Sequence, residues 1–403
     1  MLTTARVAHV VCVLTLFAAA CNADQASLIG RLNYDGRVEQ LETLGHYSAV
    51  EAAVLLQLAG GGATLNTEHG FSLYRISYPA DAVAPGTRTT VSGLIAIPDT
   101  REIKGIVSWQ HGTNSKRANS ISKPSVPEGM GVAAVFAADG YVLTAADYIG
   151  LGVSTSPQAY YHWPSTVSAV VELISVAEIM VEGITGEPAK DLFLAGFSQG
   201  AGASAATQRA LEQENPTGLA LRAVASISGA FNPIEISLRN FIERDDPFFI
   251  AFTLNSFAQI YGQELDGVIR EPYNRELAEL FDGSRGQKEI AEALPARLSQ
   301  LVTERFMNAY RAGEQFPAWF YRGLADAQTI DYSPVAPLRI FYGRDDTVVI
   351  PEEAMSAFER MQSRGANVEI VDSGPYGHDD MVVHTLPAIQ HWFDTLPREA
   401  TRD

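Results

Sequence analysis

The chain of 403 residues is longer than most single domains, so its length predicts one enlarged domain or a domain with a sizeable insertion. A hydrophobic fraction of 46% and a charged fraction of 19% are typical of a globular protein with a large core. The net charge of −18 repels phosphate backbones and anionic headgroups, so a nucleic-acid-binding role has no electrostatic basis.

Residues 1–20 are predicted to be an export signal. Arg6 supplies a positive start, and the apolar run over 7–20 is too short to span a membrane comfortably as a permanent helix. Residues 18–21, Ala-Ala-Ala-Cys, suit cleavage by an ordinary signal peptidase, and they also resemble a lipobox whose Cys21 becomes lipidated. We expect an exported protein, favouring a membrane-anchored lipoprotein over free secretion, with a retained N-terminal anchor as the third alternative.

The two cysteines, Cys12 and Cys21, set the expected redox and metal chemistry. Cys12 leaves with the export signal, so no disulfide can form within the mature chain. A Cys/His metal site is excluded by the same count. We expect neither a metal nor an organic cofactor.

The first element is predicted to be an N-terminal helical extension over 21–70, whose main helix covers 37–59. Strands at 71–78 and 89–97 are predicted to pair antiparallel across a segment rich in Pro, Asp and Gly. Strands then alternate with helices, the strands at 105–109, 141–145, 191–195, 223–227, 338–342 and 368–371 and the helices at 132–138, 165–181, 199–212, 352–364 and 382–393. This alternation predicts an α/β fold with a mostly parallel central sheet and helices on both faces.

The alternation stops between 232 and 330, where only helices are predicted, at 248–261, 273–281, 288–294, 298–312 and 319–325. This stretch is rich in Phe, and it also contains Trp319. We interpret 232–330 as a helical cap inserted into an α/β core that comprises 71–231 and 331–397. A separate helical domain is the alternative.

Residues 196–200, Gly-Phe-Ser-Gln-Gly, fit the pattern G-x-S-x-G between a predicted strand and a predicted helix. This is the setting of a nucleophile elbow, in which Gly196 and Gly200 lack Cβ atoms where strand and helix nearly touch. The turn would present the hydroxyl of Ser198 as a nucleophile. It would also aim the N–H of Gln199 at a developing oxyanion. The alternative is that Ser198 merely caps the helix.

A serine nucleophile needs a base and an orienting acid, which follow it along the chain in the order acid, then histidine, in this fold. Asp346 stands third after the glycine of the turn that follows strand 338–342, so we favour it over its neighbour Asp345. His378, in a loop rich in Gly and Pro, is the favoured base over two histidines on the closing helix, His384 and His391.

Upstream, Gln110-His111-Gly112-Thr113 follows the strand predicted at 105–109. In this fold that loop supplies the second oxyanion donor, and the amide of Thr113 or Gly112 could serve. We expect the side chain of His111 to brace the loop.

Four segments together resemble bacterial α/β-hydrolases similar to secretory lipases and carboxylesterases. They are residues 110–113, the segment Asp147-Tyr148-Ile149-Gly150-Leu151-Gly152, residues 196–200, and the pair Asp346 and His378. The resemblance covers roughly 70–232 and 330–396. It implies a cap over the pocket, and we expect residues 147–152 to line the floor of the site.

The favoured function is therefore hydrolysis of carboxylic esters through an acyl-enzyme on Ser198, with a small-molecule or lipid ester as substrate. An exopeptidase or amidase that uses the same triad is one alternative, because its first chemical step is shared. A non-enzymatic binding protein with a vestigial site is the other. Serine rather than aspartate at the elbow disfavours dehalogenase-like chemistry.

Overall fold

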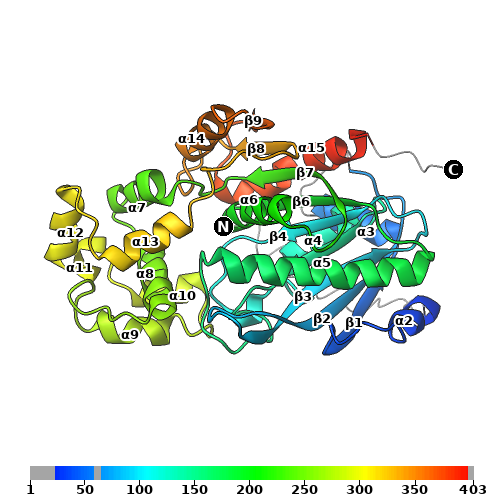
Figure 1. Cartoon of the computed structure of the whole chain (residues 1–403), viewed down its shortest axis with the longest axis horizontal. Helices are drawn as coiled ribbons and strands as arrows, with labels where there is room; N and C mark the ends of the chain where they lie inside the picture. The colour runs from blue at the N-terminus through cyan, green and yellow to red at the C-terminus, as the bar shows by residue number, and fades with distance from the viewer. Residues whose placement is uncertain (1–22, 59–64, 398–403) are drawn as a thin grey trace.

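The computed structural model describes residues 23–58 and 65–397 (Figure 1). The predicted export signal at 1–20 and Cys21 lie outside the described residues. Within the two described ranges, no helix is both long and apolar enough to cross a membrane.

A single sheet forms the centre of the described chain, in the spatial order β1-β2-β3-β5-β4-β6-β7-β8-β9. The pairs β1-β2, β2-β3 and β3-β5 are antiparallel, and all the other neighbouring strands in the sheet pair parallel. The strands are β1 (Gln40–Tyr47), β2 (Phe71–Asp81), β3 (Arg88–Pro98), β4 (Ile106–Gln110), β5 (Val142–Ala146), β6 (Asp191–Phe197), β7 (Ala220–Ile227), β8 (Leu338–Tyr342) and β9 (Val368–Asp372).

Helices cover both faces of this sheet, which confirms the predicted α/β class. One face packs against α5 (Trp163–Thr185), α6 (Gln199–Gln213) and α14 (Pro351–Gln362), with α2 (Ala23–Ile29) lying on α5. The opposite face packs against α3 (Ala49–Leu58), α4 (Pro127–Phe136) and α15 (Met381–Thr395). Because both faces are covered, β4 and β5 are buried along their whole length.

The N-terminal extension is not helical throughout, so the prediction of a helix over 37–59 is wrong for residues 40–47. These residues form β1, which pairs antiparallel with β2, and only residues 49–58 form α3. The spacing of Leu41 and Leu44 suggested one helical face. In the strand they point to opposite sides instead, Leu41 toward the α5 face and Leu44 toward the α3 face. Pairing with the edge of β2 therefore overrides the helical pattern.

Helices between residues 238 and 326 gather at one end of the sheet (Figure 1). We refer to these as the cap helices. They follow a short π-helix, Pro233–Ser237, and share a hydrophobic cluster of their own. They are α7 (Leu238–Glu243), α8 (Pro247–Tyr261), α9 (Tyr273–Leu280), α10 (Gln287–Ala293), α11 (Leu298–Leu301), α12 (Glu304–Arg311) and α13 (Ala318–Asp326).

The single helix predicted over 298–312 is wrong, because α11 and α12 are separate helices. Val302 leaves the helical path and forms a β-bridge with Ile269. The hydroxyl of Thr303 then accepts the N–H of Phe306 and caps the start of α12. The Thr303 hydroxyl bond and the β-bridge to Ile269 thus divide a segment whose hydrophobic spacing fits one continuous helix.

A buried carboxylate, Glu353 in the first turn of α14, connects that helix to the segment leading into the cap helices. It accepts the N–H groups of Phe231 at 3.0 Å and Asn232 at 2.8 Å, and the hydroxyl of Ser237 also donates to it. Burial raises the pKa of Glu353 to about 7, although the three donors work in the opposite direction.

We predict that this carboxyl makes the stability of the protein depend on pH. Because its pKa is higher in the folded protein than in the unfolded chain, the folded state holds the proton more tightly. The free energy of unfolding should fall as the pH rises from about 4.5 to about 7, by on the order of 3 kcal/mol from this group. Denaturant unfolding across this range measures the effect.

Glu353→Gln should remove that part of the pH dependence and keep the fold, because an amide can accept both N–H groups and donate to Ser237. Glu353→Ala should destabilise at every pH, since it leaves two buried N–H groups without an acceptor. The exposed neighbour offers a matched control, Glu352→Gln, which should keep the wild-type pH profile. An unchanged profile in Glu353→Gln would contradict the assignment.

Candidate active site

Ser198 occupies the turn between the end of β6 and the start of α6. Its backbone has φ 55° and ψ −118°, a conformation that L-residues rarely adopt and that stores strain. The Ser198 N–H donates to the carbonyl of Ile227 at the end of β7, at 2.8 Å. The flanking strand therefore holds the strained turn in place.

The two glycines of the motif stand where no side chain fits. A Cβ on Gly196 would lie 2.2 Å from the carbonyl oxygen of Gly200. A Cβ on Gly200 would lie 1.9 Å from the carbonyl oxygen of Gln110. Both distances are far below any real Cβ contact, so this close approach of β4, β6 and α6 requires glycine at both positions.

The structure brings Ser198, His378 and Asp346 together in one hydrogen-bonded chain. Nε2 of His378 lies 2.9 Å from Oγ of Ser198, and Nδ1 lies 2.8 Å from Oδ2 of Asp346. Asp346 is 3% exposed, and its other oxygen accepts two backbone N–H groups, from Val348 and Val349, each at 2.9 Å. These two bonds fix the carboxylate so that one oxygen faces the imidazole.

The competing residues lie elsewhere. Asp345 is exposed at the surface of the same turn. His384 is exposed on α15 and stacks on Tyr376 with a centroid separation of 3.7 Å, and His391 is exposed on the same helix. The chain of hydrogen bonds therefore runs through the aspartate and the histidine that the sequence favours.

This arrangement can activate a hydroxyl for nucleophilic attack. A carboxylate only accepts hydrogen bonds, so Nδ1 of His378 must carry the proton that faces Asp346. Nε2 is then free to accept the proton of Ser198. The carboxylate holds this tautomer and stabilises the imidazolium that forms.

The loop that follows β4 approaches the same site. Nδ1 of His111 lies 2.7 Å from the carbonyl of Gly112, and the ring stacks on Tyr148 at 4.1 Å. The hydroxyl of Thr113 lies 2.9 Å from that of Tyr160, and the Thr113 carbonyl accepts the side-chain amide of a cap residue, Gln287, at 2.7 Å. The loop is thus braced from the core by His111, as expected, and from the cap by Gln287.

One cavity contains Ser198 and His378 together with Gly112 and Thr113. Its remaining wall is largely polar and includes Asn114, Asn119, Glu128, Gln287 and Asp379. Glu128, Gln287 and the apolar Phe249 also line this cavity, although nothing in the sequence singled them out as site residues. They come from α4, α10 and α8, and no local motif marks them. Helical periodicity alone could not show which side chains of these helices would face the nucleophile.

Residues 147–152 do not line this cavity, so the expectation that they form its floor is wrong. Asp147 is fully buried and accepts hydrogen bonds from the hydroxyls of Ser92 and Ser122, at 2.5 and 2.6 Å. The ring of Tyr148 stacks on that of His111. A carboxylate that already binds buried hydroxyls serves to hold the loop that carries Gly112 rather than to contact a substrate.

Comparison with solved structures finds close matches in fold. A candidate hydrolase from Legionella pneumophila has a TM-score of 0.81 at 23% identity, covering 91% of this chain and 100% of its own. A ligand-bound form of the rice cell wall degrading esterase LipA from Xanthomonas oryzae has a TM-score of 0.77 at 22% identity, covering 90% and 99%. Candida antarctica lipase A in its closed state has a TM-score of 0.63 at 16% identity, covering 92% and 85%. At these identities the likeness shows the fold, which is the predicted α/β-hydrolase fold.

Comparison with curated protein sequences yields no match. A family model described as serine aminopeptidase, S33, matches residues 129–375, which is more than half of the chain. The match includes Ser198 and Asp346, and it ends three residues before His378. The chain therefore belongs to the serine aminopeptidase S33 family of α/β-hydrolases.

Proposed function

We propose that this hydrolase cleaves carboxylic esters through an acyl-enzyme on Ser198. The observation that carries the proposal is the hydrogen-bonded chain from Ser198 through His378 to a buried Asp346. Two proteins with the same fold, from Xanthomonas oryzae and Candida antarctica, are an esterase and a lipase, which supports ester substrates.

In the proposed mechanism, Oγ of Ser198 attacks the ester carbonyl while Nε2 of His378 takes its proton. The N–H groups of Gln199 and of Thr113 or Gly112 stabilise the oxyanion of the tetrahedral intermediate. Collapse breaks the bond to the alcohol oxygen, which leaves with the proton from His378. Water then attacks the acyl-enzyme with His378 again as the base, which releases the acid and restores Ser198.

An aminopeptidase is the second candidate, and one observation besides the family favours it. The carboxylates of Glu128 and Asp379 line the cavity that contains Ser198, where they could bind the ammonium group of a peptide N-terminus. We favour esters because Glu128 already accepts the indole N–H of Trp109 at 2.9 Å, and Asp379 is exposed to solvent.

We further propose that the protein is exported, either anchored to a membrane through lipidated Cys21 or secreted. This proposal rests on the sequence of residues 1–21 alone.

Ser198→Ala should lower kcat by at least about 10⁴-fold and leave the fold intact, because it removes the nucleophile and nothing else. Ester hydrolysis and thermal unfolding measure the two effects. A fluorophosphonate probe should label the wild-type protein and not the variant. Equal activity in Ser198→Ala would refute the mechanism, and a wild-type protein that takes no label would favour a non-enzymatic binding role.

Asp346→Asn should lower kcat by about 10⁴-fold, whereas Asp345→Asn should stay close to wild type. An amide at position 346 would present its NH₂ group to Nδ1 and hold the imidazole in the wrong tautomer. The exposed Asp345 makes this a matched pair of adjacent, isosteric changes. A larger loss in Asp345→Asn would move the acid to that residue.

The purified protein should hydrolyse p-nitrophenyl esters with a higher kcat/KM than aminoacyl p-nitroanilides. Glu128→Gln distinguishes the two candidate functions, because the amide can still accept the Trp109 N–H but carries no charge. We expect little change with neutral esters. Preferred cleavage of the anilides, with a KM that rises in Glu128→Gln, would instead establish the aminopeptidase.

A further inference from the structure

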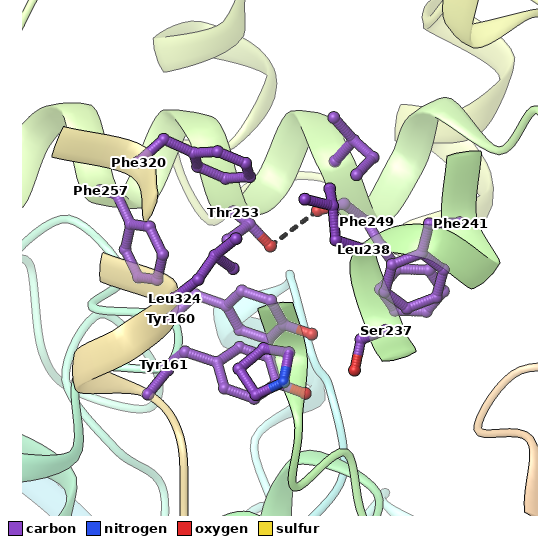
Figure 2. A pocket seen from close by; sticks show the side chains of 13 residues that line it. Tyr160, Tyr161, Ser237, Leu238, Phe241, Phe249, Thr253, Phe257, Phe320 and Leu324 are labelled. Carbon is purple, nitrogen blue, oxygen red and sulfur yellow. Dashed lines mark hydrogen bonds between the residues drawn. The ribbon is translucent and has the colours of Figure 1, made fainter. Parts of the chain in front are cut away.

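A second cavity lies among the cap helices, and its walls are mostly apolar (Figure 2). We call it the cap chamber. Figure 2 shows Phe241 and Phe249 toward one side of it and Phe257, Phe320 and Leu324 toward the other. Aromatic and aliphatic side chains on both sides suit a hydrocarbon group rather than a polar one, and the free space of about 30 Å³ holds a group about as large as one or two methylenes.

The polar groups that line the chamber already have partners within the protein. The hydroxyl of Ser237 donates to Glu353, and that of Thr253 donates to the carbonyl of Phe249 at 2.8 Å (Figure 2). The hydroxyl of Tyr160 pairs with that of Thr113. A ligand in the chamber would therefore gain mainly from the burial of its apolar surface.

Phe249 borders the chamber and also the cavity that contains Ser198. It is partly exposed, whereas its neighbours Phe248 and Ile250 on α8 are buried. Its ring stacks on Phe241 with a centroid separation of 4.7 Å and an interplanar angle of 17°, and it meets Phe248 edge-on at 5.2 Å. These two contacts hold the ring at the boundary between the two cavities.

The position of Phe249 is important for an acyl chain because most residues that line the cavity around Ser198 are polar. Its apolar lining consists of Ile121, Val126, Phe197 and Phe249, and of these only Phe249 also lines the chamber. Tyr160, the chamber residue bonded to Thr113, is fixed by a parallel stack on Phe252 at 4.1 Å. An acyl chain that extends from Ser198 toward continuous apolar surface therefore meets Phe249.

We propose that Phe249 separates the catalytic cavity from the cap chamber and sets the acyl-chain length of the substrate. With Phe249 in place the enzyme takes esters of short, straight-chain acids. Removing the ring joins the two cavities and admits longer chains. This inference rests on the proposed ester hydrolysis, and it makes Phe249 a specificity-determining residue rather than a catalytic one.

The test is a series of p-nitrophenyl esters from acetate to dodecanoate. Phe249→Ala should raise kcat/KM for octanoate relative to butanoate, by about fourfold for each methylene that enters the space left by the deleted ring together with the chamber. Phe249→Trp should shift the preference toward shorter chains. Leu324→Phe, placed in the Phe249→Ala protein, should fill the far side and cancel the gain.

Leu254→Ala is the matched control, because Leu254 is a buried apolar residue on the same helix, α8, and lines neither cavity. It should keep the wild-type chain-length profile. An unchanged profile in Phe249→Ala, or the same shift in Leu254→Ala, overturns the inference. Thermal unfolding shows that each variant is folded.

A measurement without turnover separates this inference from the proposed function. Butanamide and octanamide are titrated calorimetrically into Ser198→Ala and into Ser198→Ala carrying Phe249→Ala. The second protein should bind octanamide more tightly and butanamide equally. If the second protein binds octanamide more tightly but the wild type cleaves no ester, the proposed function is refuted and the inference about the chamber stands. Ester cleavage with no change in octanamide binding would refute the chamber alone.

Discussion

The structure depends on one close approach, in which α6 begins so near to β4 and β6 that the backbones leave no room for a Cβ atom. Gly196 and Gly200 meet that requirement, and Ser198 between them adopts a strained positive φ. The strain is sustained because its N–H bonds to β7 and because the strands around it are buried on both faces. A hydroxyl held in this way needs little further ordering before it reacts.

The parallel part of the sheet explains how distant residues meet. Ser198 follows β6, Asp346 follows β8 and His378 follows β9, and these strands run in the same direction. Residues at the carboxyl ends of parallel strands gather along one edge of the sheet. The loop after β4 begins at the same edge, because β4 runs parallel to β6, and it brings Gly112 and Thr113 to the cavity.

Much of the core and the candidate triad could be predicted from the sequence, because each rests on local patterns. The sequence around Ser198 predicts a strand, a turn flanked by glycines and a helix, and the sequence around Asp346 predicts a strand, a turn and a helix. The error at β1 arose because the spacing of Leu41 and Leu44 fits a helix, whereas pairing with β2 decides the outcome. Glu128, Phe249 and Gln287 could not be found in advance. Their roles depend on how whole helices pack over the cavity, which residue order does not encode locally.

The contact between Gln287 and the carbonyl of Thr113 means that the cap helices and the α/β core are not independent modules. The carboxylate of Glu353 also binds the backbone N–H groups of Phe231 and Asn232, in the segment that leads from the core into the cap helices. A chimera that received the cap of another α/β-hydrolase would lose the brace on the loop beside Ser198 unless the graft supplied an equivalent amide. Within this architecture, exchange of the cap therefore alters the catalytic machinery itself as well as the substrate it receives.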